Sequence, residues 1–275
     1  MAVPIQSQIY NPITGVFGNG QMQIFSTSGT WTVPPGVAKV RVRMWGAGGS
    51  SGNQASYYSG GGGGGFALKA IYELTGITSI PVTVGAGITN IQSGSTSTGF
   101  RAGTSSFGSY CSATGGLTGI TSDNAVGGTG VGGDINNTGG KAGWGGGTSS
   151  GGGGGSASLI GGGGNGGVSA MGNSPTGGAG GGWGSSGQNN PGTGGFMTTG
   201  GVSSQTTSYF STMPTASIQP FSIDFIGTGG GGGWNQPGVN GGGGGFQCLG
   251  GFPGGGTAYG GPTAISTGGL VIVEW

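Results

Sequence analysis

Histidine is absent from the 275-residue chain, and only 4% of its residues are charged. The lack of histidine excludes Ser-His-Asp and Cys-His catalysis and removes the commonest metal ligand. The acidic residues are Glu73, Asp123, Asp134, Asp224 and Glu274. A glycosidase needs two carboxylates across a cleft; Asp123 and Asp134 could approach one another, but solvated loop carboxylates are the simpler interpretation. We therefore expect no catalytic residues, no metal and no cofactor.

An excess of either charge is also lacking, because six basic residues face five acidic ones and the net charge is +1. This balance argues against nucleic acid or an anionic membrane as partner. No apolar run reaches the length of a bilayer span. Residues 1–6 show neither a basic region nor the apolar stretch of a Sec signal. A protein of this kind that acts outside a cell is expected to leave by lysis within an assembled particle.

Cysteine is nearly absent, with only Cys111 and Cys248 present. Two cysteines are too few for a disulfide scaffold, and their spacing does not suit a zinc site. A single bridge and two buried thiols both remain open, and buried thiols are the simpler interpretation.

Glycine, by contrast, supplies 81 of the 275 residues. Collagen is excluded because no Gly-X-Y register is sustained. Disorder fits poorly, since charge is scarce while 11 Phe, 7 Tyr and 6 Trp are present. If the glycine-rich chain is ordered, its folding must offset a loss of backbone entropy that is about 0.5–1 kcal/mol larger per glycine than for alanine. Backbone hydrogen bonds between closely packed segments could do so, because only glycine permits such an approach.

The first part of the chain has the period-two pattern of β-strands. Val40, Val42 and Met44 alternate with Lys39, Arg41 and Arg43. We interpret the basic set as a solvated strand face, with contact to anionic lipopolysaccharide or an acidic subunit as the alternative. The expected strands are 23–25, 29–34, 37–45, 66–72, 79–84, 104–112 and 269–275.

Between residues 113 and 268, runs of glycine alternate with polar stretches. Glycine disfavours helix and gives strands nothing to pack, whereas polyproline II suits it. We predict a mainly β fold with little or no helix, in which a small antiparallel β domain joins a glycine-rich polyglycine-II (polyproline-II-like) bundle. The β domain comprises about 21–112 and 269–275, and the glycine-rich insertion comprises about 113–268. Residues 1–20 are predicted to be an attachment segment preceding this 21–275 domain.

Several segments, taken together, carry a family resemblance. Gly-Thr-Trp-Thr-Val-Pro-Pro-Gly-Val at 29–37, followed by Lys-Val-Arg-Val at 39–42 and Trp-Gly-Ala-Gly-Gly at 45–49, resembles the opening of glycine-rich domains in bacteriophage tail-fibre proteins. The match continues at 60–66, 81–87, 104–109, 113–116 and 268–275. The glycine runs are also similar in style to tail-fibre-tip adhesins of T-even-type phages, whose polyglycine-II sandwich carries receptor-binding loops.

The resemblance implies a virion protein, made in the host cytoplasm and carried on a tail fibre or other external appendage. Its implied partners are a bacterial surface receptor, either an outer-membrane protein or a polysaccharide, and other virion proteins bound through residues 1–20. Monomer and homotrimer both remain open. The alternative function is a structural virion protein, such as a capsid decoration or head fibre, without a receptor. An ice-binding protein is a weaker rival, because the loops are irregular.

Aromatic residues in polar stretches are the candidate receptor-binding residues, because aromatic rings give large contact area at low entropy cost. We expect the loops between glycine runs to be the contact surface. The candidates are Tyr57 and Tyr58 in a polar loop over 50–59 and Tyr209, Phe210 and Met213 in the 203–219 stretch. Binding and plain packing explain these five about equally well. Aromatics flanked by glycine are instead expected to cap the edges of the glycine lattice, with sugar stacking as the alternative. These are Trp144, Trp183, Trp234 and Phe246.

Overall fold

The computed structural model describes residues 17, 20–54, 57–88, 100–119, 125–146, 151–167, 226–227, 243, 250–257 and 266–275. Within these ranges the fold is all-β and contains no helix. Two five-stranded antiparallel sheets and one three-stranded sheet account for the strands of this part of the chain. The prediction of a mainly β fold is confirmed.

The first sheet contains both the alternating basic strand and the C-terminal strand. Its order is β1 (Met22–Phe25), β13 (Leu270–Glu274), β3 (Val40–Trp45), β6 (Phe66–Ile71) and β11 (Ile135–Asn137). All neighbours are antiparallel. The predicted alternation of β3 is confirmed, because Val40, Val42 and Met44 are fully buried on one face.

The second sheet has the order β10 (Gly130–Val131), β9 (Cys111–Ala113), β8 (Ser105–Phe107), β7 (Ser79–Thr83) and β2 (Gly29–Thr32). The prediction of one strand over 104–112 is wrong. The chain turns at residues 108–110 and returns as β9, with Phe107 paired to Cys111. Gly108 adopts a φ of 50°, a left-handed conformation that a residue with a side chain enters only at a cost.

The main hydrophobic core lies between these two sheets. Trp31 from β2 is at its centre, with its ring 5.8 Å from that of Phe107 and 5.6 Å from that of Trp275. Each fully buried aliphatic side chain contributes about 1.5–3 kcal/mol, so this core is the main hydrophobic support of the β part. Its other buried members include Phe25, Val40, Val42, Met44, Ile71, Leu74, Ile80, Val82, Val271 and Val273.

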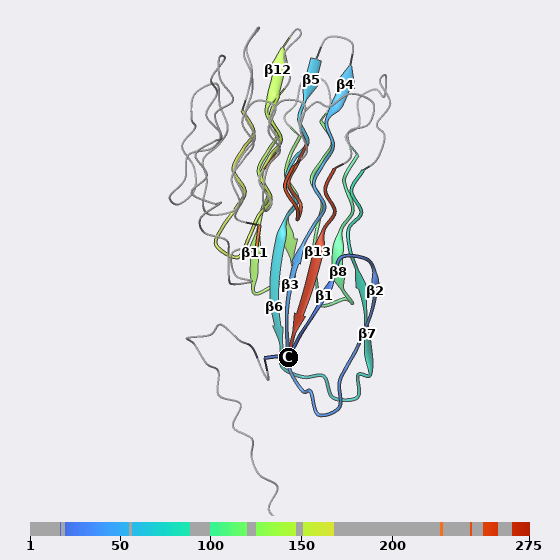
Figure 1. Ribbon diagram of the computed structural model, residues 1–275. Coiled ribbons are helices and arrows are strands. Elements are labelled where there is room, and N and C mark those ends of the chain that lie inside the picture. The colour runs from blue at the N-terminus through green and yellow to red at the C-terminus, as the bar shows by residue number, and fades with distance from the viewer. Residues whose placement is uncertain are drawn as a thin grey trace, which may run out of the picture.

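Glycine-rich segments continue the strands of both sheets toward one end of the molecule (Figure 1). Segment 46–51 follows β3, segment 60–65 leads into β6, and segment 114–119 follows β9. We call the glycine-rich segments that extend the sheets the glycine array. Its described members are 46–51, 60–65, 84–88, 100–103, 114–119, 125–129, 138–143, 151–167, 250–257 and 266–269.

Segment 60–65 is the centre of the glycine array, and its N–H groups donate to three different segments in rotation. Gly60 and Gly63 donate to the carbonyls of Gly143 and Gly140, at 3.2 and 2.9 Å. Two N–H groups that are three residues apart therefore donate to the same neighbouring segment. The same rule holds for Gly61 and Gly64, which donate to Thr257 and Gly254, and for Gly62 and Gly65, which donate to Leu117 and Thr114.

The carbonyl groups of the central segment accept from three further segments. Those of Gly62 and Gly65 accept from 46–49, those of Gly61 and Gly64 from 154–157, and that of Gly63 from Gly128. Six segments therefore surround residues 60–65. A Cβ atom at any of these six glycines would overlap the backbone of one of those neighbours, so the packing requires glycine at each of them.

A third, three-stranded sheet stands at the far end of the glycine array, opposite the C-terminus (Figure 1). It consists of β12 (Trp144–Gly146), β5 (Tyr57–Ser59) and β4 (Gly52–Gln54), with β5 in the middle. We call this end the distal end, and the end at the C-terminus the proximal end. Strands β10, β11 and β12 all lie within the segment predicted as a glycine-rich insertion.

Candidate functional site

Two of the five predicted receptor-binding residues lie at the distal end. The prediction of a polar loop over 50–59 is wrong, because β4 and β5 lie within it and both tyrosines belong to β5. Tyr57 is in register with Gln54 and Gly146, and Tyr58 with Asn53 and Gly145. The other three, Tyr209, Phe210 and Met213, lie outside the described residues, as do Trp183, Trp234 and Phe246. Trp144 is in register with Ser59.

The distal sheet is tied to the glycine array at its base. Strand β5 runs directly into the central segment 60–65, and the buried Ser59 hydroxyl has the carbonyl oxygens of Gly60 and Gly143 as acceptors within reach, at 3.3 and 3.4 Å. The backbone N–H of Ser51 donates to the hydroxyl of Thr257 at 2.9 Å. The β4–β5 hairpin is therefore a direct extension of the central segment 60–65.

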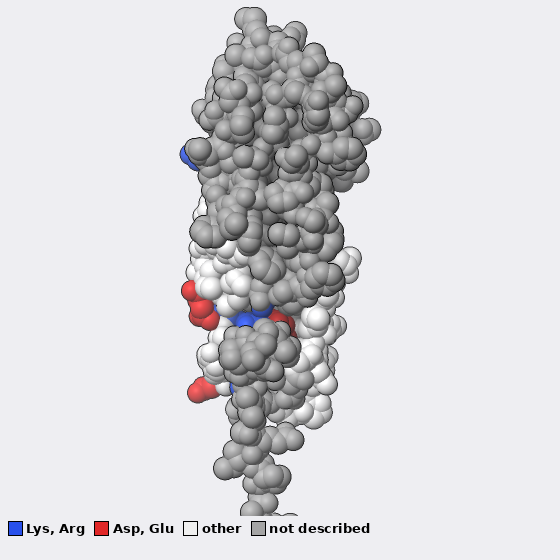
Figure 2. All heavy atoms as spheres, turned by 60° about the vertical axis from the view of Figure 1, so that its left-hand side comes forward, with Lys and Arg blue, Asp and Glu red and all other residues white. Residues whose placement is uncertain are grey.

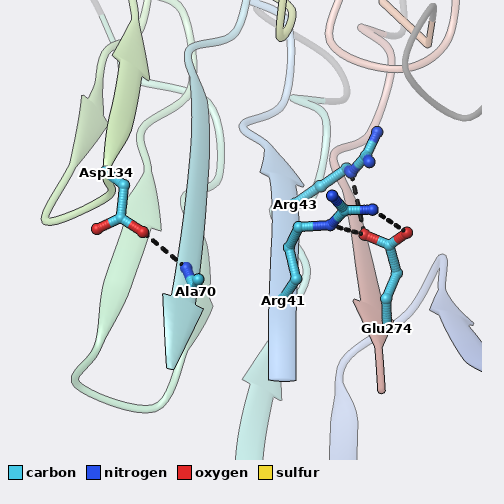
Figure 3. A network of polar contacts seen from close by, with 5 residues as sticks. All are labelled: Arg41, Arg43, Ala70, Asp134 and Glu274. Atoms are coloured by element: carbon cyan, nitrogen blue, oxygen red, sulfur yellow. Dashed lines mark hydrogen bonds and ion pairs between the residues drawn. The ribbon is translucent and has the colours of Figure 1, made fainter. Parts of the chain in front are cut away.

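The proximal part of the first sheet carries a buried charge cluster (Figure 3). The carboxylate of Glu274 accepts from Arg41 Nε at 2.7 Å, from Arg41 Nη2 at 2.9 Å and from Arg43 Nε at 3.1 Å. The side chain of Arg43 is 1% exposed, that of Glu274 7% and that of Arg41 13%. The adjacent strands bring these groups together, since Arg41 and Glu274 are direct partners in the β3–β13 register.

The prediction that Lys39, Arg41 and Arg43 form a solvated basic face is therefore wrong for both arginines. Their strand packs beside β13, which supplies a carboxylate on the same face. In Figure 2 the visible basic atoms of the proximal half lie close to acidic atoms and form no broad basic patch. Sequence reasoning missed the cluster, although Glu274 is the single acid in the expected strand 269–275.

The chain enters the proximal end beside this cluster. The ring of Phe17 is half-buried and lies over Lys39 and Arg41, 5.8 Å from Nζ and 5.1 Å from Cζ. Gln21 and Trp275 exchange both backbone hydrogen bonds, at 3.1 and 3.0 Å. The indole N–H of Trp275 also donates to Oε1 of Gln21 at 3.0 Å. The two ends of the described chain are thus joined at the proximal end.

Asp134 has a structural role in the described chain. One oxygen of its carboxylate accepts the backbone N–H of Ala70 at 2.8 Å, and the other lies 3.7 Å from Lys69 Nζ. Asp123 lies outside the described residues, so its distance from Asp134 is not given by the structure. Among the residues that are described, no three His, Cys, Asp or Glu side chains cluster as metal ligands would.

Cys111, in β9, has a free thiol that is buried in the main hydrophobic core. Cys248 lies outside the described residues. Burial raises the pKa of the Cys111 thiol to about 11 from 9.0, and the charges of Lys69, which lowers it, and Asp134, which raises it, have smaller effects. A thiol with so high a pKa is protonated at neutral pH and makes a poor nucleophile.

The stability of the protein should decline between pH 9 and pH 11 because of Cys111. Below pH 9 the thiol is protonated in both states, whereas above that pH the unfolded thiol ionises first and unfolding is favoured. Urea unfolding of the wild type and Cys111→Ala at pH 8 and pH 11 measures this effect. The stability advantage of wild type over the variant should shrink with pH; a constant difference would contradict it.

Comparison with known proteins gives no family assignment. No helix in the described part of the chain has the length and hydropathy of a membrane span. No protein-family model matches the chain, and no curated protein sequence matches it.

Proposed function

We propose that the chain is a bacteriophage receptor-binding adhesin, located at a tail-fibre tip or similar appendage, which recognises a bacterial surface structure with its distal end. The observation that carries this proposal is the separation of the two ends. The predicted binding residues Tyr57 and Tyr58 are on β5, at the distal end (Figure 1). At the opposite, proximal end Phe17 lies over Arg41, and Gln21 pairs with Trp275. A rigid body with contact residues at one end and its chain entry at the other suits a molecule that links a particle to a surface.

We further propose that the glycine array is a polyglycine-II bundle. Polyproline-II-type helices have three residues per turn, and the donors of residues 60–65 return to the same neighbour every third residue. Six surrounding segments are also what hexagonal packing of such helices requires. This packing supports the stiffness that the adhesin needs, because the backbone of the central segment 60–65 is hydrogen-bonded to six neighbouring segments.

The distal end has the chemistry of a recognition surface. The β4–β5 hairpin extends the central segment, so the neighbours of that segment surround its base. Tyrosine can stack on a sugar or dock on a protein loop, while its hydroxyl offers a polar contact. The receptor is therefore proposed to be a surface polysaccharide or an exposed loop of an outer-membrane protein.

Alanine at Tyr57 and Tyr58 is expected to weaken binding to host cells at least about tenfold, which corresponds to about 1.4 kcal/mol, with little change in melting temperature. Tyr209 and Phe210 are expected to behave alike if the 203–219 stretch shares the contact. Fluorescently labelled protein is titrated on a panel of candidate host strains, and melting is followed in parallel. Saturable binding to particular strains supports the proposal.

Tyr72 offers a matched control, because it is an exposed tyrosine just after β6 at the proximal end. Tyr72→Ala should leave cell binding unchanged. If Tyr57→Ala and Tyr58→Ala lower stability as much as binding, the tyrosines are packing residues. If the folded wild type binds no strain, the structural alternative is favoured, and many copies on the head of the particle would identify a decoration protein.

A further inference from the structure

Three basic residues lie in β3 and directly before it, at the proximal end of the first sheet. Lys39, Arg41 and Arg43 project from one stretch of chain, and Glu274 is the carboxylate bound to both arginines. The face of an aromatic ring is electronegative and attracts cations placed within about 6 Å of its centroid. Phe17 supplies such a ring over Lys39 and Arg41.

The backbone on the C-terminal side of Phe17 is fixed as well. The N–H of Gly20 donates to the carbonyl of Phe17 at 3.1 Å, which closes a turn, and Gly20 adopts a φ of 77°. Gln21 is then held by both backbone bonds and the indole bond to Trp275. Phe17 on one side of the turn and Gln21 on the other therefore hold the chain in place where it enters the domain.

We propose that Phe17 is a positioning residue for attachment: its ring, seated on Lys39 and Arg41, fixes the point and direction at which the attachment segment joins the domain. The partner served by this joint is the virion protein that carries the adhesin. This inference rests on the proposed attachment through residues 1–20. The joint lowers the entropy lost on docking, because the residue at which the segment joins the domain is held in place before the carrier is met.

The first test uses the purified full chain and chymotrypsin, which cleaves after Phe17 only when the ring leaves its seat. Lys39→Gln removes one of the two cations and leaves both the ring and the Glu274 cluster intact. A cation–π contact of about 0.5–1 kcal/mol corresponds to about two- to fivefold faster cleavage after Phe17 in the variant. Cleavage after Tyr10 serves as the internal reference; equal rates after Phe17 in wild type and variant would overturn the proposal.

The second test counts adhesin copies on washed phage particles produced with each variant supplied in trans. Phe17→Ala should lower the bound copies about fivefold, as expected for the loss of about 1 kcal/mol, while Phe17→Tyr, which keeps the ring, should restore them. Melting temperatures should be equal, which separates positioning from folding; should Phe17→Ala lower the melting temperature, Lys39→Gln is counted in its place.

A deletion of residues 2–16 distinguishes two kinds of failure. If the deletion variant is lost from particles but Phe17→Ala is retained at the wild-type level, attachment stands and the positioning role of Phe17 is refuted. If the deletion variant is also retained, residues 2–16 are not the attachment segment and that part of the proposed function fails. Loss of both variants, with rescue by Phe17→Tyr, supports the proposal.

Discussion

Replacement of Gly63 by alanine is expected to lower the free energy of unfolding by about 3–5 kcal/mol. The added Cβ would overlap the carbonyl group of Gly155, and both are backbone positions enclosed by other segments, so neither can move aside locally. Overpacking costs about 1–3 kcal/mol, and each weakened backbone hydrogen bond adds about 1 kcal/mol. The bonds at risk are those from Gly63 to Gly140 and from Gly128 to Gly63. Urea unfolding followed by tryptophan fluorescence measures the loss.

Gly268→Ala is the matched control for this prediction. The atom nearest to a Cβ at Gly268 is the carbonyl oxygen of Gly85, at an ordinary contact distance of 3.6 Å. The control should change stability by less than about 1 kcal/mol, since alanine also restricts the unfolded chain. Similar losses for the two variants would show that glycine matters here for its backbone freedom alone, and not for the close approach of the segments.

The second large effect is expected at Glu274, where substitution by glutamine should cost about 3–5 kcal/mol. The change keeps the shape of the side chain but removes the negative charge that the buried Arg43 and the largely buried Arg41 both contact. Removal of one partner from a buried ion pair is strongly destabilising because the remaining charge cannot recover its hydration. Thermal and urea unfolding of the full chain measure the effect.

Asp134→Asn makes the same chemical change at a site that is 52% exposed. Its ion pair with Lys69 is solvated, so the loss should stay below about 1 kcal/mol. Arg43→Met in the Glu274→Gln background should recover part of the stability, because it removes a buried positive charge that has lost its contact with the Glu274 carboxylate. If Glu274→Gln and Asp134→Asn lower the free energy of unfolding by the same amount, burial of the charge does not explain the effect at Glu274.

The strands with side-chain patterns could be predicted from the sequence. In β3, apolar residues alternate with basic ones from Val40 to Met44, and the apolar set is buried. In β13, the run from Leu270 to Val273 is apolar throughout, which also favours a buried strand, and the two strands pair. The predicted 104–112 strand failed because the turn at Gly108 is short and is flanked by residues that suit a strand. The prediction that Arg43 lies on a solvated face failed for another reason. Its partner Glu274 is 231 residues away in the sequence, and only the order of strands in the sheet brings the two together.

The sequence predicts that glycine segments pack closely through backbone hydrogen bonds, but it does not predict which segments are neighbours. Glycines such as Gly61 and Gly62 are identical in sequence, yet they donate to different segments, at Thr257 and Leu117. Without side chains no pattern of polarity indicates which segment is whose neighbour. For the candidate site, the tyrosines of β5 were identified by their polar surroundings, whereas their position at the distal end depends on that arrangement.

The rotation of donors in segment 60–65 also restricts how such a chain can change in length during evolution. Loss of one residue between Gly60 and Gly63 would turn every later N–H toward the wrong neighbour, so that Gly63 would no longer meet Gly140. Insertions and deletions within an enclosed segment can therefore preserve its pairing only in multiples of three residues. Where the chain turns between segments no such phase applies, so new residues can enter there one at a time while the enclosed segments stay fixed.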